Sequence, residues 1–360
     1  MGVFCQIVIQ LVIISLQYIA GGSILHAILP DIFDFHTGMI VSAITFIGIT
    51  FIGGMWSASL SNVLNIILIY VGILAATIIQ FKKIGSMDHL AAALPANVPW
   101  FSFIDGVGPV TITSWVVTLI TVNLSLQSIL QISLGAKDAA TAKKGFVWGG
   151  ILMLPVGVLA AFLGLVAKAM YPDAQAALAL PQVIVGLQPV LAGITLAALW
   201  AADVSTACTI LLGAATLFSN DIYKRFINPT VAENKFVIIN RLSVFAVGLI
   251  TLWFAFNAAG IVKTMIAGLS MTCGLTCVFF FTMFAPGLCR RSSAFWTTLV
   301  SLIGIALWFV PGSPLAGIKP LFANEVIYFE WPICIITFLL VAMLDKNKIK
   351  EVVEVPEEEE

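Results

Sequence analysis

Long apolar runs alternate with short polar segments along almost the whole chain. A run of about 20 apolar residues is long enough to cross a bilayer as a helix. Ten such runs are predicted, at about 4–29, 38–55, 59–81, 110–133, 146–170, 184–217, 236–256, 262–284, 294–310 and 328–344. The pattern therefore predicts an all-α, polytopic membrane helix bundle with about ten transmembrane helices.

Composition supports this fold class. Of the 360 residues, 60% are hydrophobic and 10% are charged, and the mean hydropathy is +1.08. Soluble domains carry roughly 25% charged residues, so a soluble enzyme with a single anchor is excluded. The six cysteines form no Cys-x-x-Cys pair and are predicted to be free, buried thiols: Cys5, Cys208, Cys273, Cys277, Cys289 and Cys334.

The orientation in the membrane is predicted from lysine and arginine. Twelve of the 17 basic residues follow the fourth, sixth, eighth and tenth runs, and five lie in the opposite loops and span ends. Since cytoplasmic loops carry the excess of positive charge, both termini are predicted to be cytoplasmic. We expect an integral protein of the plasma (cell inner) membrane, with membrane lipid as a partner and no nucleic acid.

The middle of the sixth run carries polar groups. At 100° per residue, Ala202, Ser205, Thr206 and Thr209 fall on one face of a helix. A backbone carbonyl and two or three hydroxyls form a hard-oxygen site that suits a small cation. The alternative is that the hydroxyls bond back to carbonyls of the preceding turn and only bend the helix.

Two motifs in this stretch carry a resemblance to a known family. Ala201-Ala202-Asp203-Val204-Ser205-Thr206 and then Asp221-Ile222-Tyr223-Lys224 resemble the sodium-site helix and its exit in the sodium:solute symporter family, of the sodium/glucose, sodium/proline and sodium/pantothenate type. The resemblance implies sodium as the coupling ion and no organic cofactor. It further implies that Ser205 and Thr206 offer hydroxyls to sodium and that Ala202 offers its backbone carbonyl.

Asp203 lies beside this face, about 60° around the helix from Thr206 and nearly opposite Ser205. A carboxylate without a partner in the bilayer would take up a proton rather than stay charged. Asp203 is therefore structural, attracts a cation or the solute in a cavity, or couples protons. We favour a carboxylate that faces a cavity.

Side-chain amides recur along two other predicted spans. Gln10 and Gln17 lie on roughly one face of the first span, and Asn123, Gln127 and Gln131 recur every four residues in the fourth. These amides either bond helices together or line the solute pathway, and pathway lining is favoured for the fourth span. No Gly or Pro interrupts that span, so the sequence gives no pointer to a broken helix.

The resemblance also implies an architecture of two inverted five-helix repeats in one transmembrane domain, 1–360. Residues 1–81 would be the remnant of the first repeat, 110–284 the second repeat, 294–344 two additional helices and 345–360 a cytoplasmic tail. The chain would then be N-terminally incomplete, without a peripheral helix and the first two core helices, and an adjacent reading frame that encodes these helices is a candidate partner. The family's aspartate in the fifth helix of the first repeat is replaced by Asn62, which puts a second cation site there in doubt.

Three functions are compared. The leading hypothesis is sodium-coupled symport of a small polar organic solute by alternating access. The alternative is an N-terminally truncated, non-transporting membrane module, such as a fragment, a partner subunit or a sensor. An enzyme is not expected, because His26, His36 and His89 are scattered in or near the outer-side loops and form no catalytic cluster.

Overall fold

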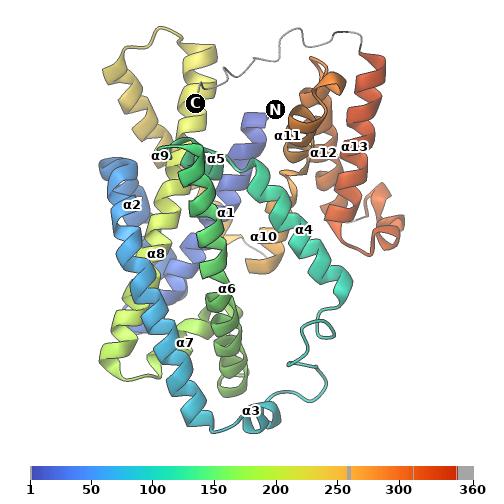
Figure 1. Cartoon of the computed structure of the whole chain (residues 1–360). Helices are drawn as coiled ribbons and strands as arrows, with labels where there is room; N and C mark the ends of the chain where they lie inside the picture. Colours follow the sequence, from blue (N-terminus) through green and yellow to red (C-terminus); the bar gives the residue numbers. More distant parts are fainter. Residues whose placement is uncertain (1, 258–260, 311, 346, 348–360) are drawn as a thin grey trace. The chain divides into compact units, whose positions relative to one another are not determined.

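The computed structural model describes residues 2–257, 261–310, 312–345 and 347, with the backbone alone for 53–64 and 261–264. Helices dominate this part of the chain (Figure 1). Its α-helices are α1 (Gly2–Ile28), α2 (Phe35–Ile84), α3 (Met87–Ala93), α4 (Pro109–Ser125), α5 (Gln127–Leu134), α6 (Ala139–Met170), α7 (Ala179–Val185), α8 (Pro189–Thr216), α9 (Glu233–Phe256), α10 (Ile261–Ser270), α11 (Cys273–Phe284), α12 (Ser293–Phe309) and α13 (Val326–Leu344). Short helical turns are η1 (Ala176–Leu178), η3 (Pro286–Leu288), η4 (Pro314–Gly317) and η5 (Lys319–Phe322), and η2 (Leu217–Ile227) is a π-helix that continues α8.

The predicted membrane helix bundle is confirmed. In the described residues, eight helical segments are long and apolar enough to cross a membrane, and α4 with α5 makes a ninth if this bent pair is one span. The predicted run 294–310 forms α12, a helix of 17 residues that is slightly shorter than the others. The inverted repeat and the boundaries of its parts stay predictions.

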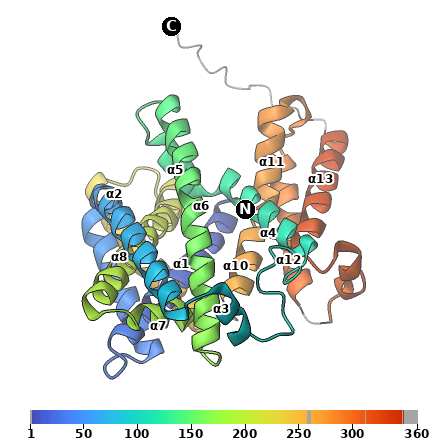
Figure 2. The same cartoon turned by 60° about the horizontal axis from the view of Figure 1, so that its bottom comes forward.

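The chain divides into two compact units. The first contains residues 1–9, 107–129 and 262–360, and the second contains 10–106 and 130–261. In the first unit α11, α12 and α13 pack side by side, as Figure 2 shows for α11 and α13. The rings of Phe281 and Phe338 stack 4.2 Å apart between these two helices, in an apolar cluster that also holds four cysteines.

The second unit is centred on α8, which packs along α2 and α9. Its core combines side chains from α2, α6, α7 and α8, including Ile73, Leu163, Ile184 and Leu196, each at most 3% exposed. The short helix α7 precedes α8, and α8 itself covers most of the sixth predicted run, 184–217.

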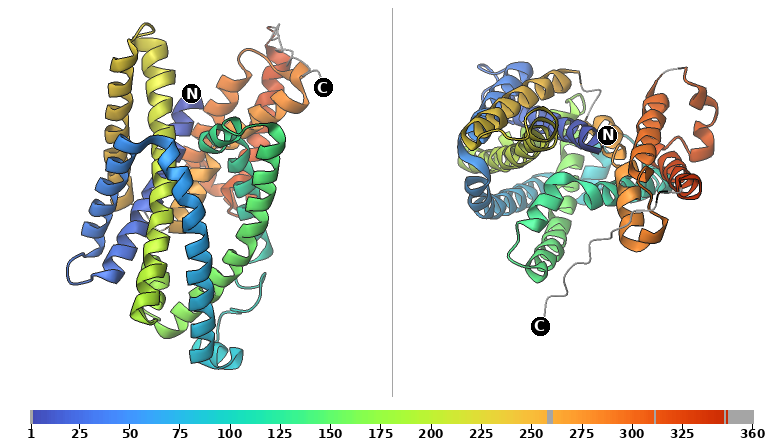
Figure 3. Two further views of the ribbon diagram at one scale, coloured as in Figure 1. Left: turned by 60° about the vertical axis from the view of Figure 1, so that its left-hand side comes forward. Right: turned by 90° about the horizontal axis from the view of Figure 1, so that it is seen from above.

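Helix α2 contains both the second and the third predicted spans. Its helical backbone is continuous over 50 residues, far more than the roughly 20 residues that one bilayer crossing needs. The windows Phe35–Ile52 and Asn65–Ile84 are separate candidate spans inside it. Figure 3 shows the first part running up and the second running down, so the helix axis reverses between them.

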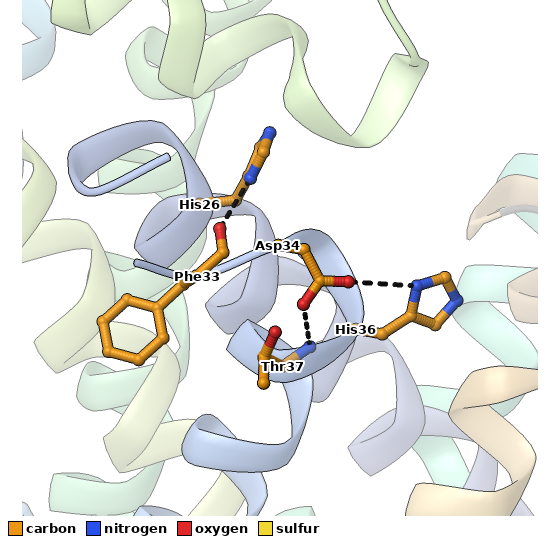
Figure 4. Close-up of polar contacts among 5 residues, drawn as sticks. All are labelled: His26, Phe33, Asp34, His36 and Thr37. Carbon is orange, nitrogen blue, oxygen red and sulfur yellow. Dashed lines mark hydrogen bonds and ion pairs between the residues drawn. The ribbon is translucent and has the colours of Figure 1, made fainter. Parts of the chain in front are cut away.

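A polar turn joins α1 to α2. Asp34 caps α2 by accepting a hydrogen bond from the backbone N–H of Thr37 at 3.0 Å, and its other oxygen lies 3.8 Å from Nδ1 of His36 (Figure 4). His26 Nδ1 lies 2.8 Å from the carbonyl oxygen of Phe33. Each histidine thus closes the turn locally, which agrees with the structural role that a scattered histidine usually has.

Candidate cation and solute site

The predicted sodium face lies on α8 as the sequence implies. The hydroxyls of Ser205 and Thr206 both donate to the carbonyl oxygen of Ala202, at 2.8 and 3.1 Å. Ala202 and Ser205 are half-buried and Thr206 is exposed. Three hard oxygens, one carbonyl and two hydroxyls, therefore gather at one point on the helix surface.

These hydrogen bonds also agree with the alternative interpretation, in which the hydroxyls only bond back to their own helix. Thr209 repeats the pattern one turn on, since its hydroxyl donates to the carbonyl of Ser205 at 2.9 Å. A hydroxyl that donates its proton keeps its oxygen lone pairs for a second partner. The back-bonding therefore orients these oxygens without using them up as ligands.

Asp203 points away from this face, into the packing between α8, α1 and α2. It is 7% exposed, and neither carboxylate oxygen has a hydrogen-bond partner among the described residues. A Cβ atom added to Gly21 of α1 would lie 2.9 Å from Oδ2 of Asp203 and 2.5 Å from Oγ of Ser42 on α2. The carboxyl group therefore lies close to the α1 backbone, where only glycine leaves room for it.

The amides of α1 differ in their surroundings although they share a face. Gln10 is fully buried, lies against Gly213 of α8, and has no hydrogen-bond partner for either amide atom among the described residues. Gln17 is half-buried. Gln6, in contrast, is 8% exposed and makes two hydrogen bonds to the fourth span.

The fourth span is broken. Helix α4 ends at Ser125, α5 begins at Gln127, and their axes differ by 50°. The side chain of Asn123 is exposed and donates to the carbonyl of Leu119 at 2.7 Å, whereas Gln127 and Gln131 lie on the other side of the break. The three amides therefore do not form one continuous stripe, because the four-residue spacing holds only within an unbroken helix.

Polar side chains satisfy the backbone at this break. The Gln6 amide donates to the carbonyl of Ser125 at 2.5 Å and accepts from the N–H of Gln127 at 3.2 Å. From α11, Thr276 donates to the carbonyl of Thr121 at 2.7 Å and bonds the Ser125 hydroxyl at 2.7 Å. Backbone groups freed inside a membrane need such partners, so the break is a built feature of the first unit.

The exit motif after α8 forms the π-helix η2. The N–H of Asn228 bonds the carbonyl of Tyr223 five residues earlier, at 2.9 Å. Ser219 donates to Asn240 of α9 at 3.1 Å, and the Lys224 ammonium lies 5.3 Å above the ring of Phe236. These contacts join the end of α8 to the start of α9. The side chain of Asn62, the departure from the family's aspartate, lies outside the described residues.

Residues 1–301 match the sequence profile of the sodium:solute symporter family. The chain belongs to this family. The relatives with curated names are distant in sequence. A sodium/proline symporter of Staphylococcus aureus (strain bovine RF122 / ET3-1) is 23% identical over 93% of this chain and 69% of its own length. Sodium/glucose cotransporter 4 of Danio rerio is 24% identical over 81% of this chain, and the match spans about half of the cotransporter, 52%.

A solved structure shares the fold of this chain. It is a substrate-bound, outward-open state of a sodium-coupled sialic acid symporter, superposed with a TM-score of 0.71 at 15% identity. The superposition covers 98% of this chain and 75% of that protein. The family and the membrane helix fold that the motifs predict are thus confirmed, whereas the assigned residues stay predictions.

Proposed function

We propose that this chain carries out sodium-coupled symport of a small polar organic solute by alternating access. Family membership and the symporter fold support the proposal. The named relatives are symporters or cotransporters of proline, glucose and sialic acid, all small and polar, and all are sodium-coupled by name. These relatives share the coupling ion and differ in the solute. The ion site is therefore the part of the proposed function that can be argued best from the residues of this chain.

The observation that carries the proposal is the group of three oxygens on α8. The carbonyl of Ala202 lies within hydrogen-bond distance of both the Ser205 and the Thr206 hydroxyls, at 2.8 and 3.1 Å. Oxygen ligands are those that hard cations prefer. In the proposed mechanism the two hydroxyls rotate their protons away from the carbonyl, and all three oxygens then turn lone pairs toward sodium, the transported ion.

Asp203 and Thr209 are proposed as secondary contributors to cation or solute binding. A buried carboxylate with no hydrogen-bond donor is strongly disfavoured as a bare charge. Asp203 therefore holds a proton or a cation at some stage, on the side of α8 that faces Gly21 and Ser42. The amides of Gln10, Gln17, Asn123, Gln127 and Gln131 stay individual candidates for contact with the solute, on the basis of their spacing in the sequence.

We also propose that the protein resides in the plasma or inner cell membrane with both termini in the cytoplasm, on the basis of the distribution of lysine and arginine. In this orientation the exit segment η2, with Lys224 and Arg225, faces the cytoplasm.

Sodium binding can be tested without knowing the solute. The full chain is purified in detergent, and its thermal unfolding is measured in sodium chloride and in potassium chloride of equal ionic strength. A ligand that binds the folded state stabilises it according to its concentration relative to Kd. We expect stabilisation that is specific for sodium. Ser205→Ala and Thr206→Val each leave a ligand position unfilled, a loss of about 1–3 kcal/mol, which shifts the sodium midpoint about 5- to 150-fold.

Thr216→Val is the matched control, because Thr216 also lies on α8 and donates to the carbonyl of Leu212 at 2.8 Å but belongs to no proposed site. An equal midpoint in all three variants would show that the hydroxyls only bond their own helix. Sodium-driven uptake of candidate solutes into proteoliposomes then distinguishes symport from the non-transporting module, which binds sodium at most and accumulates nothing.

A further inference from the structure

A cluster of thiols and a carboxyl group lies in the first unit, where α11, α12 and α13 pack (Figure 2). It consists of Cys273 of α11 and of Glu330 and Cys334 of α13. One donor atom from each lies within 4.8 Å of the other two, and all three residues are 0% exposed. None of them belongs to the cation or solute residues described above.

The local sequence explains how these donors meet. Glu330 and Cys334 are four residues apart, so they lie on one face of α13, and the Cys334 thiol lies 3.9 Å from Oε2 of Glu330. Ser301 of α12 donates to the same oxygen at 2.6 Å. Gly304, one turn further along α12, leaves the space for Oε1, since a Cβ there would lie 2.8 Å from that oxygen.

This carboxyl group lacks the partners that burial demands. Oε1 of Glu330 has no hydrogen-bond partner among the described residues. Among the described residues the single ion pair is that between His36 and Asp34. No basic side chain in that part of the chain is therefore paired with Glu330. A buried charge must be paired, neutralised by a proton or bound to a metal. The two neighbouring thiols favour metal binding over pairing or protonation, because thiolates are metal ligands.

We propose that Cys273, Glu330 and Cys334 bind a thiophilic divalent metal ion of the zinc class. Zinc takes thiolate sulfur at about 2.3 Å and carboxylate oxygen at about 2.0–2.2 Å, so a tetrahedral site separates sulfur and oxygen by about 3.5 Å. The observed 3.9 Å between the Cys334 sulfur and the Glu330 oxygen is close to that spacing. Binding draws the donors slightly inward and releases the protons of the two thiols, since both sulfurs ligate as thiolates.

The ion cross-links α11 to α13, and the Ser301 hydroxyl orients the carboxylate ligand from α12. A hydrogen bond from a neighbouring side chain commonly fixes a ligand in this way. Since its ligands come from α11 and α13, the expected role of the ion is to hold these two helices together, with the fourth coordination position not filled by these three residues.

The test uses the full chain, purified in detergent with its thiols reduced and titrated with cadmium ion, whose bonds to thiolate absorb in the ultraviolet. We expect one cadmium ion per chain, displaced by zinc. Cys273→Ser, Cys334→Ser and Glu330→Gln each remove a ligand and should weaken cadmium binding at least about 10- to 100-fold. Cys5→Ser is the matched control, since Cys5 is another fully buried free thiol of the same unit.

Three results would overturn the proposal. They are no cadmium–thiolate absorption in the reduced wild-type chain, binding that is equal in Glu330→Gln and wild type, and binding that is lost equally in Cys5→Ser. The first is measured on the unaltered protein, so it decides even if a variant fails to fold. Circular dichroism of each variant confirms that weakened binding does not come from unfolding.

Discussion

The pair of glutamines on α1 allows a direct test of how the break in the fourth span is held. Gln6→Leu removes an amide that bonds both sides of the break, the carbonyl of Ser125 and the N–H of Gln127. In an unbroken helix these groups would pair with the N–H of Ile129 and the carbonyl of Asn123. The N–H of Ile129 instead bonds the carbonyl of Leu126 at 3.1 Å, so the side chain of Gln6 takes the place of two lost helix bonds.

The expected loss follows from these two bonds. Hydrogen bonds inside membrane proteins contribute on average about 0.6 and at most about 1.7 kcal/mol each. A buried polar group left without any partner costs about 1–3 kcal/mol. Two groups are affected and leucine retains most of the packing volume, so Gln6→Leu should lower the free energy of unfolding by about 1–4 kcal/mol.

The assay is reversible denaturant unfolding in detergent micelles, followed by circular dichroism. The control is Gln10→Leu, on the same helix and face, where both amide atoms lack partners in the described residues and the side chain is fully buried. Its replacement removes an unsatisfied group and should leave stability unchanged or higher. Equal stability losses in both variants would refute the reasoning, because they would show that the amide bonds at the break contribute nothing.

Three further outcomes are expected. Asp203→Asn should keep helix content and membrane insertion but weaken cation-dependent uptake, and unaltered sodium and pH dependence would make Asp203 structural. Lys143→Cys in a cysteine-free background should resist an impermeant thiol reagent added outside, and labelling from outside would reverse the topology. The Thr141 backbone N–H bonds the carboxylate of Asp138 at 2.6 Å, which lowers the pKa of Asp138 below its usual 3.8. The cap therefore stabilises the start of α6 fully above pH 3.8 and is lost as pH falls through the lowered pKa. Hydrogen exchange at the Thr141 amide should rise in that range relative to Asp138→Asn, and identical profiles would refute the charge effect.

Sequence patterns predict the spans well because hydropathy alone decides which segments enter a bilayer. The apolar run 236–256 becomes α9 (Glu233–Phe256), and 328–344 becomes α13 (Val326–Leu344). The join between the second and third spans is different. The sequence predicts two separate spans here, 38–55 and 59–81, whereas the backbone is helical throughout α2 and its axis reverses between the two spans. Hydropathy therefore gives the spans but not the geometry of the connection between them.

The broken fourth span shows a break that the sequence does not predict. No Gly or Pro lies near Leu126, and a regular amide spacing runs through the break, so the sequence favours a continuous helix. The break depends on a partner far away in the chain, Gln6, whose amide supplies two hydrogen bonds that the helix gives up, and Thr276 bonds the nearby Thr121 carbonyl. Such partners become visible only when the helices are placed against one another.

The candidate site also has one part that the sequence predicts and another part that depends on contacts between helices. The one-face arrangement of Ala202, Ser205 and Thr206 follows from helical geometry, and the structure reproduces it. The surroundings of Asp203 could not be predicted, because Gly21 and Ser42 come from two other helices. Glu330 gave a usable signal, an ionisable residue inside a predicted span, but its approach to Cys273 required the packing of α11 on α13.

The hydrogen bonds from Ser205 and Thr206 to the carbonyl of Ala202 bear on the step of the proposed transport cycle in which the protein returns without its cargo. In the proposed alternating-access cycle the protein changes conformation both with and without its cargo, and oxygen ligands without any partner would oppose the unloaded step. In the proposed site the carbonyl of Ala202 accepts a hydrogen bond from each hydroxyl, so the three groups satisfy one another without sodium. Sodium would compete with these internal hydrogen bonds. This competition would moderate its affinity and favour its release on the side where sodium is scarce.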